Sequence, residues 1–481
     1  MSKGKNEYVD FHCHPAMKPF GKSFKRRNIG KNHPRKRRRN SIWHYNPPSL
    51  LDKLINMVTG LTKFSQSNFT SMAKGDISVA CASLYPIEKG FFENKIGNEF
   101  LKDVIANFAT GVGKRRVDAV QGMKNYFKDL EMEYDFYRQL DNRVIRISEG
   151  KCRYKLVKNY AELEAIKANK SKLTTIGVVL TIEGMHVLNS DLKNAPVESD
   201  YIRNIQKIKA WECPPFFVSI AHHFWNHLCG HAESFNKTIK RFIDQSEMMD
   251  TGFTSLGKAV LHELLDDTRG KRILIDIKHM SVASRKEFYA ILDSRPEYQN
   301  VPILVSHGAA NGLKSFNERV VEGSNKADKL KRADINFFNN EIIRLAKSKG
   351  ILGLQLDERR IANKRTLKDT KHAISRSKIM HYRSELLWNQ VQHILEVLDN
   401  EGLFAWDCLA LGTDFDGIID PLNGFWTAEE LPYLADFLER HAFNYMENAN
   451  LKLAANKIKA NEIVHRLMTS NGMNFLKEHF R

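Results

Sequence analysis

The stretch EYVDFHCHPAMKPFG, residues 7–21, begins with a short apolar run that is typical of a β-strand and contains two histidines one residue apart. In a strand, alternate side chains share one face, so His12 and His14 point together while Cys13 points away. A single buried histidine usually has a structural role, but a pair at this spacing, at the carboxyl end of a leading strand, is a common metal-ligand arrangement. The stretch therefore predicts a first strand that delivers two imidazoles to one place.

Seven more apolar or β-branched runs follow this first strand. With residues 8–13 they make eight, at 77–84, 175–182, 216–221, 272–277, 301–305, 351–356 and 408–412. Apolar positions recur at spacings of three and four in the segments between them, at 159–168, 255–267, 284–292, 336–349 and 383–400. Strands that alternate with helices pair in parallel through right-handed crossovers, and eight such units predict an α/β fold with a closed (β/α)8 barrel. A doubly wound open sheet is the alternative.

Two segments interrupt this rhythm and are interpreted as insertions on βα connections. The first is a basic loop at 18–50, and the second is a long, mostly helical insertion at about 86–158. Residues 314–334 and 359–382 are two further charged connections. No internal repeat or low-complexity linker divides the chain, so we expect residues 1–481 to form a single elaborated barrel domain. The insertion at 86–158 is interpreted either as a lid over the barrel rim or as a subunit contact of a homodimer.

The composition is that of an ordinary globular protein, with 42% hydrophobic and 27% charged residues in a chain of 481. No run approaches eighteen apolar residues, so no transmembrane helix is expected. The first strand begins near Tyr8, which leaves no room for a signal peptide, and we therefore expect a cytoplasmic protein. The six cysteines are scattered without a CxxC pair, which favours reduced, mostly buried thiols.

The formal net charge of +18 favours anionic partners, and much of the excess is local. The densest part is Arg35–Arg39 in the basic loop. A solvated loop is the preferred interpretation, and binding of nucleic acid or an anionic surface is the alternative. Aromatic residues do not alternate with the basic ones, which weakens the nucleic-acid interpretation.

Polar residues of metal-ligand or acid–base type stand at or just after the carboxyl ends of the later predicted strands. They are Glu183, His222, His223, His279, His307 and Asp414. Barrel enzymes gather their active sites at this rim, so we expect these side chains to converge with those of the first strand. His186, His227 and His231 lie nearby in sequence and are interpreted as pocket lining or surface.

This set of residues is typical of a two-metal hydrolase. Four imidazoles and one carboxylate suit two zinc ions that share a water and lower its pKa. In such a site Glu183 bridges the ions, His12 and His14 hold one of them, and His279 and His307 hold the other. Asp414 then takes a proton from the bridging water and passes it to the leaving amine, and His223 stabilises the oxyanion.

Several motifs resemble the membrane dipeptidase (renal dipeptidase) family of the amidohydrolase superfamily. They are TIEGMH at 181–186, IDIKHMS at 275–281, VSHGAANG at 305–312, LGTDFDG at 411–417 with IDPLNGF at 419–425, and SNGMNFLKEHF at 470–480. The resemblance covers most of the chain from Tyr8 to Phe480, apart from the two insertions. It implies a metal-dependent dipeptidase on a TIM-barrel-like fold, usually with two zinc ions.

The resemblance also implies roles for individual residues. His12 falls on the family's first ligand of strand one, Glu183 on its bridging glutamate, and Asp414 on its catalytic aspartate. His279 and His307 fall on the two ligands of the second metal. By its spacing to Asn226, His223 matches the histidine that contacts substrate, although His222 leaves the register open by one residue.

Two departures from the family pattern stand out. His14 occupies a position where the family normally has aspartate, which removes one negative charge from the site. The family also places an arginine after the histidine of strand six to hold the substrate carboxylate. Glu318 stands at roughly that spacing here, and Arg319 follows it as the expected substrate-binding residue. The rivals on nearby rim loops are Arg332, Arg359 and Arg360.

These observations predict a zinc-dependent dipeptidase that acts on a small-molecule dipeptide. An amidohydrolase acting on another amide or a lactone is the first alternative, favoured by His14 and the shifted arginine. A non-catalytic basic binding protein on the same fold is the second, and the apparently complete ligand set argues against it.

Overall fold

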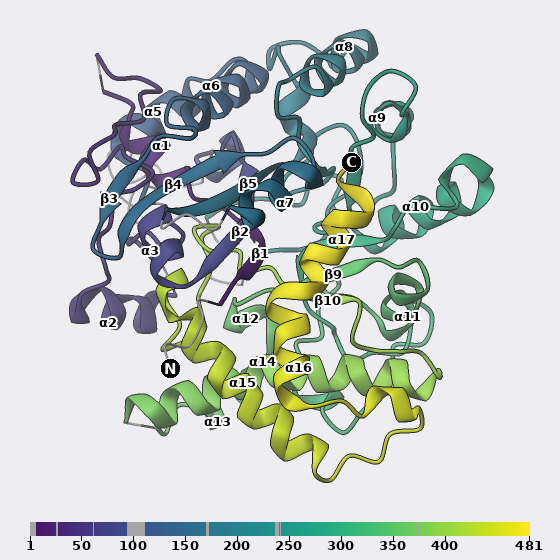
Figure 1. Ribbon diagram of the computed structural model, residues 1–481. Helices are drawn as coiled ribbons and strands as arrows, with labels where there is room; N and C mark the ends of the chain where they lie inside the picture. Colours follow the sequence, from purple (N-terminus) through teal and green to yellow (C-terminus); the bar gives the residue numbers. More distant parts are fainter. Residues whose placement is uncertain are drawn as a thin grey trace.

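The computed structural model describes residues 6–25, 27–60, 62–93, 111–169, 173–235, 240, 242–373 and 375–481. All eight runs predicted as strands form strands, which follow chain order around one sheet with parallel pairing between neighbours (Figure 1). They are β1 (Tyr8–Cys13), β2 (Ile77–Leu84), β5 (Thr174–Glu183), β6 (Phe217–Ser219), β7 (Leu274–Asp276), β8 (Leu304–Gly308), β9 (Ile351–Leu354) and β10 (Leu409–Leu411).

The two ends of this sheet meet beside β1. The backbone N–H of His14 donates to the carbonyl of Phe415, and the N–H of Asp414 donates to the carbonyl of His12, each at 2.9 Å. Because Asp414 and Phe415 follow β10, the segment after the last strand closes onto the first. The predicted (β/α)8 architecture is therefore confirmed as a nearly closed barrel, and the doubly wound open sheet is excluded.

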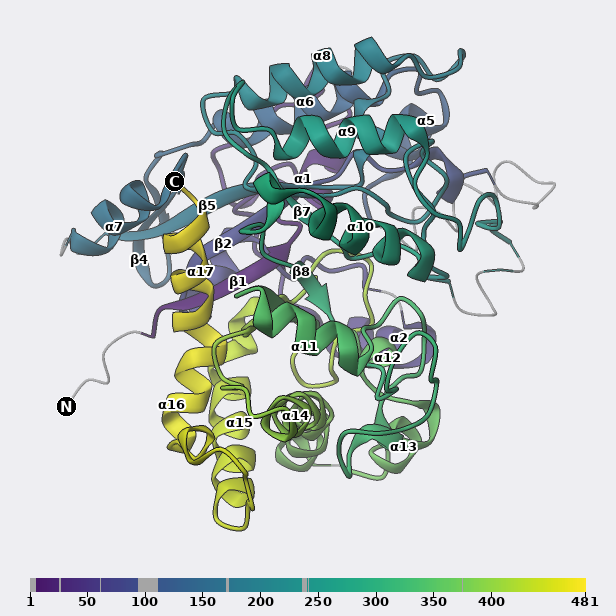
Figure 2. The same cartoon turned by 90° about the vertical axis from the view of Figure 1, so that its right-hand side faces the viewer.

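Helices follow most of the strands and cover the outside of the barrel (Figure 2). They are α1 (Met17–Lys22), α2 (Leu50–Thr59), α3 (Phe69–Lys74), α5 (Lys114–Gln121), α6 (Tyr126–Arg138), α7 (Tyr160–Ala168), α8 (Glu198–Lys209), α9 (Ser255–Leu265), α10 (Val282–Ser294), α11 (Asn339–Lys347), α12 (Glu358–Ile361), α13 (Lys364–Asp369), α14 (Arg376–Asn400), α15 (Leu431–Met446), α16 (Ala460–His465) and α17 (Asn471–His479). The side chains of Asn159, Thr254 and Ser281 accept backbone N–H bonds at the starts of α7, α9 and α10. These caps fix where three of the five predicted helices begin.

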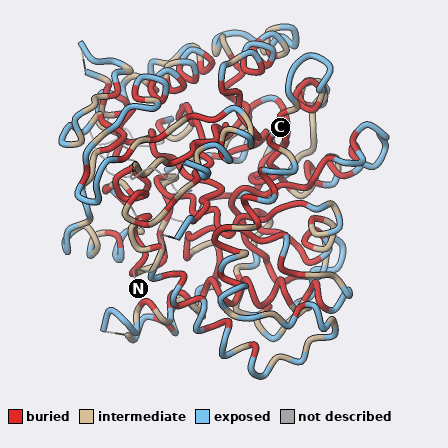
Figure 3. The backbone as a smooth tube through the Cα atoms, viewed as in Figure 1, coloured by how far each residue is buried: buried red, intermediate tan, exposed pale blue. Residues whose placement is uncertain are grey.

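The strands of the barrel are buried, while exposed residues gather on the outer helices and loops (Figure 3). Every residue of β1 is buried, including the carboxylate of Asp10. Asp10 accepts hydrogen bonds from the backbone N–H of Thr413 at 2.9 Å and from its hydroxyl at 2.7 Å. A buried carboxylate needs such partners, and these two bonds tie the loop after β10 to the first strand.

The insertion at 86–158 contains the helices α5 and α6 and then a hairpin that the helical pattern did not predict. Its strands are β3 (Ile145–Ile147) and β4 (Gly150–Leu156), and β4 also pairs in parallel with β5. The buried residues of β4 are Cys152, Tyr154 and Leu156, which alternate with the period of a strand. Residues 94–110 of this insertion lie outside the described residues.

All six cysteines are buried free thiols, as predicted. Over the described ranges, no helix is both long enough and apolar enough to span a membrane.

Candidate metal centre and active site

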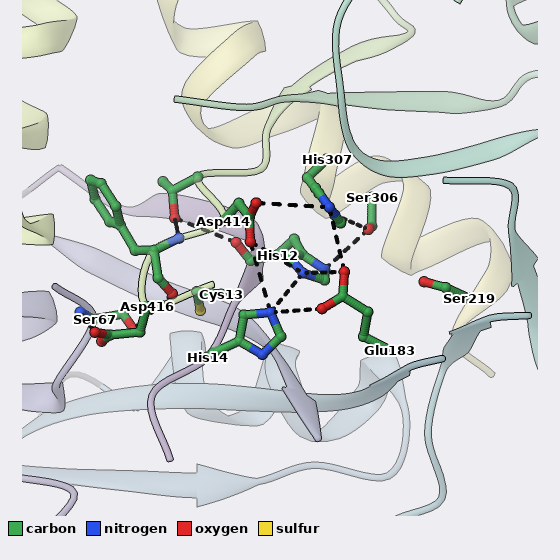
Figure 4. Close-up of polar contacts among 12 residues, drawn as sticks. His12, Cys13, His14, Ser67, Glu183, Ser219, Ser306, His307, Asp414 and Asp416 are labelled. Atoms are coloured by element: carbon green, nitrogen blue, oxygen red, sulfur yellow. Dashed lines mark hydrogen bonds and ion pairs between the residues drawn. The ribbon is translucent and has the colours of Figure 1, made fainter. Parts of the chain in front are cut away.

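The site lies at the carboxyl ends of the barrel strands, where the predicted residues come together. Figure 4 shows His12, His14, His307 and Asp414 turned toward the carboxylate of Glu183. These side chains come from β1, from β8, from the last residue of β5 and from the loop after β10. His279, after β7, joins them, and all six residues are at most 9% exposed. The rim of the barrel thus holds a closed cluster of imidazoles and carboxylates.

The first group of ligand atoms comes from β1 and β5. The Nε2 atoms of His12 and His14 lie 3.1 Å apart. Glu183 Oε2 lies 3.1 Å from His14 Nε2, and Glu183 Oε1 lies 3.6 Å from His12 Nε2. The two histidines of the opening stretch therefore face one spot, as their spacing predicted.

The second group of ligand atoms comes from β8 and from the loop after β7. Glu183 Oε1 lies 3.1 Å from Nε2 of His279 and 3.4 Å from Nε2 of His307. The two imidazole nitrogens are 3.3 Å apart. Glu183 is therefore shared, with Oε2 nearest to His14 and Oε1 nearest to His279 and His307.

The spacing within each group fits a small divalent cation. Zinc bonds of 2.0–2.1 Å in a tetrahedral site place neighbouring ligand atoms about 3.3 Å apart. The separations in the two groups run from 3.1 to 3.6 Å. Imidazole nitrogens and carboxylate oxygens are also the donors that such a cation prefers. The residues present therefore fit a metal site in which Glu183 contributes to both groups.

The hydroxyl of Ser306 connects one histidine of each group. Its Oγ lies 3.0 Å from Nδ1 of His12 and 3.0 Å from Nδ1 of His307, and it donates to Asp276 Oδ2 at 2.6 Å. Because its single proton goes to Asp276, the hydroxyl can only accept from the two imidazoles. Both Nδ1 atoms then carry protons, and both Nε2 lone pairs face Glu183.

Close packing of the strands holds this serine in place. A Cβ atom added at Gly353 or Gly412 would lie 2.0 or 2.1 Å from the carbonyl oxygen of Ser306. Glycine is therefore required at these positions, in β9 and directly after β10. The side chain of Asp276 also accepts a hydrogen bond from the hydroxyl of Ser219 at 3.0 Å. Neither Ser306 nor Asp276 was predicted from the sequence.

Asp414 lies across both groups. Its Oδ1 is 3.9 Å from His12 Nε2 and 3.8 Å from His14 Nε2, and its Oδ2 is 3.9 Å from His307 Nε2. Its backbone is left-handed, with φ of 60°, a conformation that side chains other than glycine rarely adopt. Such strain is retained where the surroundings fix the chain, here through the Asp10–Thr413 bonds and Asp416. Asp416 accepts from Lys18 Nζ at 2.6 Å and from the Ser67 hydroxyl at 2.8 Å.

The two carboxyl groups of the site have pKa values that lie far apart. Burial raises the pKa of Glu183, but the neighbouring imidazoles of His222, His12 and His14 outweigh it and hold the value well below its usual range. Burial and the charge of Glu183 raise the pKa of Asp414 well above its usual range. Glu183 is therefore a permanent anion, while Asp414 can carry a proton.

His222 and His223 are adjacent in the chain but have different surroundings. His222 is buried, with Nδ1 2.5 Å from Glu88 Oε2 and Nε2 3.5 Å from Glu183 Oε2. His223 is only partly buried, and its Nδ1 lies 2.6 Å from the hydroxyl of Ser234. One ligand atom each of His222, His223 and His279 lie within 4.8 Å of one another. His222 thus faces the metal-ligand groups, and His223 faces Ser234.

Hydrogen bonds constrain the tautomers of these two rings. The carboxylate of Glu88 accepts a hydrogen bond from Nδ1 of His222, so in the neutral ring Nε2 offers a lone pair. The hydroxyl of Ser234 accepts from Gln245 Nε2 at 3.0 Å, lies 2.6 Å from Nδ1 of His223 and lies 3.5 Å from Gln245 Oε1. When this hydroxyl donates to Nδ1, Nε2 of His223 is the N–H donor. Glu88, four residues beyond the end of β2, was missed because the end of that strand was not followed.

The arginine expected to hold a substrate carboxylate is already paired. Both terminal nitrogens of Arg319 bind Asp334, at 2.8 and 2.9 Å, and half of its side chain is exposed. Its rival Arg360 donates to the backbone carbonyl of Ser234. The charge of Asp414 also acts on Arg360, whose pKa is lowered chiefly by burial. Arg360 is therefore bonded to the serine that contacts His223, whereas Arg319 is bonded to Asp334.

A buried lysine lies among these groups. Lys278 is 1% exposed, and its Nζ has no hydrogen-bond partner among the described residues. Burial, and then the charge of Arg360, lower the pKa of Lys278 to about 7. Its charge also acts on Asp414 and His307. Because it directly precedes His279 on the chain, the sequence could have drawn attention to it.

Comparison with known proteins finds one matching family model and several similar solved structures. A family model described as membrane dipeptidase (peptidase family M19) matches residues 43–469. Glu183, His279, His307 and Asp414 lie inside this range, whereas His12 and His14 precede it. No curated protein matches the chain.

Solved structures similar to the chain share little sequence with it. Dipeptidase AC, a metallopeptidase of family M19, is 12% identical, with 99% of each chain covered and a TM-score of 0.50. A metallopeptidase from Rhodobacter sphaeroides, liganded with a phosphinate mimic of the dipeptide L-Ala-D-Ala, is 12% identical, with 99% of this chain and 100% of that chain covered and a TM-score of 0.49. At 12% identity, the similarity to dipeptidase AC supports the fold alone.

Proposed function

Because the chain belongs to the membrane dipeptidase family, peptidase family M19, we propose that it is a zinc-dependent dipeptidase that hydrolyses the peptide bond of small dipeptides. The observation that carries this proposal is the carboxylate of Glu183, which offers one oxygen to His14 and the other to His279 and His307. Ligand groups that share a carboxylate are typical of hydrolases with two zinc ions. Zinc bound there supplies the Lewis acidity that activates water and polarises a carbonyl group.

Asp414 is the proposed proton carrier. Its two oxygens lie 3.8–3.9 Å from Nε2 atoms of both ligand groups, so it borders the space in which water and substrate meet. Its raised pKa lets it accept a proton more readily than an ordinary carboxylate does. It takes this proton from the attacking water and gives it to the leaving amine.

His223 is the proposed donor to the carbonyl oxygen of the scissile bond. In this role the hydroxyl of Ser234 donates to Nδ1 of His223, which leaves Nε2 as an N–H donor, whereas the bond to Glu88 leaves Nε2 of a neutral His222 as a lone pair. Burial lowers the pKa of His223 well below its usual range, so the ring is neutral. A fixed neutral donor stabilises an oxyanion without adding charge in the ground state.

A free carboxylate on the substrate needs a cation close to the metal centre. Both terminal nitrogens of Arg319 are already bound by Asp334. The charges of Arg360 and Asp414 act on Lys278, and the charge of Asp414 acts on Arg360. Lys278 has no hydrogen-bond partner among the described residues. We propose that Arg360 and Lys278 hold the carboxylate, with Arg319 as the alternative.

Steady-state hydrolysis of L,L and L,D dipeptides, with zinc supplied, tests the proposal. Each dipeptide is compared with its C-terminal amide, which removes the carboxylate charge. A charge-assisted contact predicts that the amide has a KM higher by about tenfold or more. Arg360→Gln should abolish this preference and Arg319→Gln should keep it, and the reverse result would assign the carboxylate to Arg319.

Two outcomes would contradict a dipeptidase. Zinc-loaded protein that hydrolyses a cyclic amide or a lactone but no dipeptide would move the substrate to the first alternative. Protein that neither binds zinc nor hydrolyses any of these compounds would favour the non-catalytic interpretation.

A further inference from the structure

A groove lined by described residues lies away from the metal centre, where the two insertions meet. It has a volume of about 910 Å³ and lies between the basic loop and the β3 strand. Its lining residues are Pro34, Arg35, Lys36, Arg37, Arg38, Arg143, Val144, Ile145 and Arg146. In Figure 1 the purple segment after α1 lies beside β3 at the edge of the molecule. Each insertion contributes one wall of this cationic groove.

The loop that forms the first wall is folded rather than a loose chain. The backbone N–H of His33 donates to the carbonyl of Asn40 at 2.9 Å, which closes the loop at its base. Inside it, the N–H of Arg38 donates to the carbonyl of Arg35 at 2.9 Å. His44 Nδ1 lies 3.0 Å from the carbonyl of Lys36 and donates to it. The guanidinium groups are therefore presented from a fixed backbone.

The two insertions are also fixed to each other. The side chain of Gln139, just after α6, accepts from the N–H of Asn32 at 2.9 Å and donates to the carbonyl of Gly30 at 2.7 Å. Asn32 Nδ2 donates to the carbonyl of Phe136 at 2.9 Å. These bonds hold the basic loop against the end of α6, and Arg143, the first groove residue of the second wall, lies five residues after that end. The groove therefore depends on the contact between the basic loop and the insertion that contains α6 and β3.

The charge of the groove is uncompensated. Six of its nine lining residues are cations and none is acidic. Among the described residues, none of these six side chains makes an ion pair, although nearby Arg138 pairs with Asp135. Burial, and then the charges of Arg38, Arg35 and Arg143, lower the pKa of His33. Like charges held together in this way repel one another and attract an anion.

We propose that this groove binds a run of phosphate groups on a soluble polyanion. Guanidinium groups bind phosphate through paired hydrogen bonds, and five of the six cations are arginines. The floor residues Val144, Ile145 and Pro34 offer no aromatic ring on which a nucleic-acid base would stack, so the phosphates themselves are the recognised feature. A concave wall also suits a narrow anion better than the flat surface of a bilayer.

Calorimetric titration of the full chain tests the proposal with two phosphate sources. Inorganic tripolyphosphate represents a free polyphosphate, and a short RNA duplex represents a phosphate backbone. We expect at least one of them to bind, with an affinity that falls steeply as salt rises. The source that binds more tightly identifies the kind of ligand.

Paired variants separate the groove from the general positive charge of the chain. Arg143→Gln with Arg146→Gln, and separately Arg37→Gln with Arg38→Gln, should each weaken binding about tenfold or more. The matched control is Arg365→Gln with Lys368→Gln, which removes the same charge from the exposed helix α13. This control should leave the affinity nearly unchanged.

Three results would overturn the proposal. They are the absence of binding to both probes, equal weakening by the groove variants and the α13 control, and binding only to vesicles that contain phosphatidylserine. Thermal unfolding of each variant shows whether it is folded. Because the substituted arginines are exposed, we expect unchanged transitions.

Discussion

The metal centre and the cationic groove concentrate charge in opposite ways. At the barrel rim, buried carboxylates and imidazoles lie within 3.1–3.9 Å of one another, and Glu183 is shared by two groups of ligand atoms. In the groove, exposed cations of one sign stand together without an acidic partner among the described residues. The rim therefore fits a small cation that its own anions attract, whereas the groove requires the ligand to bring the opposite charge.

The two regions also differ in how firmly hydrogen bonds hold their side chains. Ser306 and Asp276 fix the orientation of rim imidazoles through hydrogen bonds of 2.6–3.0 Å. The groove arginines have fixed backbones but no such partners for their side chains among the described residues. Single substitutions at the rim should therefore have large effects on turnover, and substitutions in the groove should have almost none.

The largest effect is expected from removing the shared carboxylate. Glu183→Gln takes the anion from both ligand groups, so turnover of a dipeptide should fall by at least about a thousandfold. Zinc content, measured by elemental analysis, should fall with it. His279→Ala is the narrower test, because it removes a ligand of one group only and should leave the fold intact. If His279→Ala unfolds the protein, His279 is a structural histidine rather than a ligand.

Asp414→Asn should come next. It keeps the size of the side chain but cannot carry the proton, so kcat should fall by about 10²–10⁴-fold. Because Asp414 lies farther from the imidazole nitrogens than Glu183 does, zinc content should stay at the wild-type value. Loss of zinc together with activity would make Asp414 a ligand instead of a proton carrier.

A smaller effect is expected from Ser306→Ala. Removing the hydroxyl frees Nδ1 of His12 and of His307, so zinc affinity should fall by about 10–100-fold while excess zinc restores activity. Ser219→Ala is the matched control, because its hydroxyl reaches Asp276 but neither imidazole. Zinc affinity is measured by competition with a chelator. An equal loss of affinity in both variants would assign the effect to Asp276 alone.

The smallest effect sharpens the contrast between the two regions. Arg143→Gln with Arg146→Gln should leave kcat and KM for a dipeptide within about twofold of wild type. Its free energy of unfolding should change by less than about 0.5 kcal/mol, because the change is on the surface. Chemical denaturation and steady-state kinetics measure both quantities. A large loss of turnover would mean that the groove and the rim are coupled.

The sequence was informative wherever chain topology decides the outcome. His12, His14, Glu183 and His307 come together because the carboxyl ends of parallel strands meet at one rim, so strand order alone places them. The spacing of His12 and His14 also placed them on one face without a match to the family, whose matched range begins at residue 43. The eight strands were found because apolar runs and helical patterns alternate along most of the chain.

Contacts made by individual side chains, or between segments far apart in the chain, were not predictable in this way. Glu88 reaches His222 from a loop, and the choice of tautomer at His223 depends on the hydroxyl of Ser234. Whether an arginine faces the site depends on its pairing, as with Arg319 and Asp334. The groove joins Arg38 to Arg143, and no local pattern indicates that these segments meet.

The most direct test of the account is the zinc content of the full chain, purified without chelator and then supplied with zinc, measured by elemental analysis alongside dipeptide hydrolysis. Two groups of ligand atoms that share Glu183 predict about two zinc ions per active chain. A chain that binds no zinc, or that is fully active with a single ion, would contradict the shared-carboxylate metal centre.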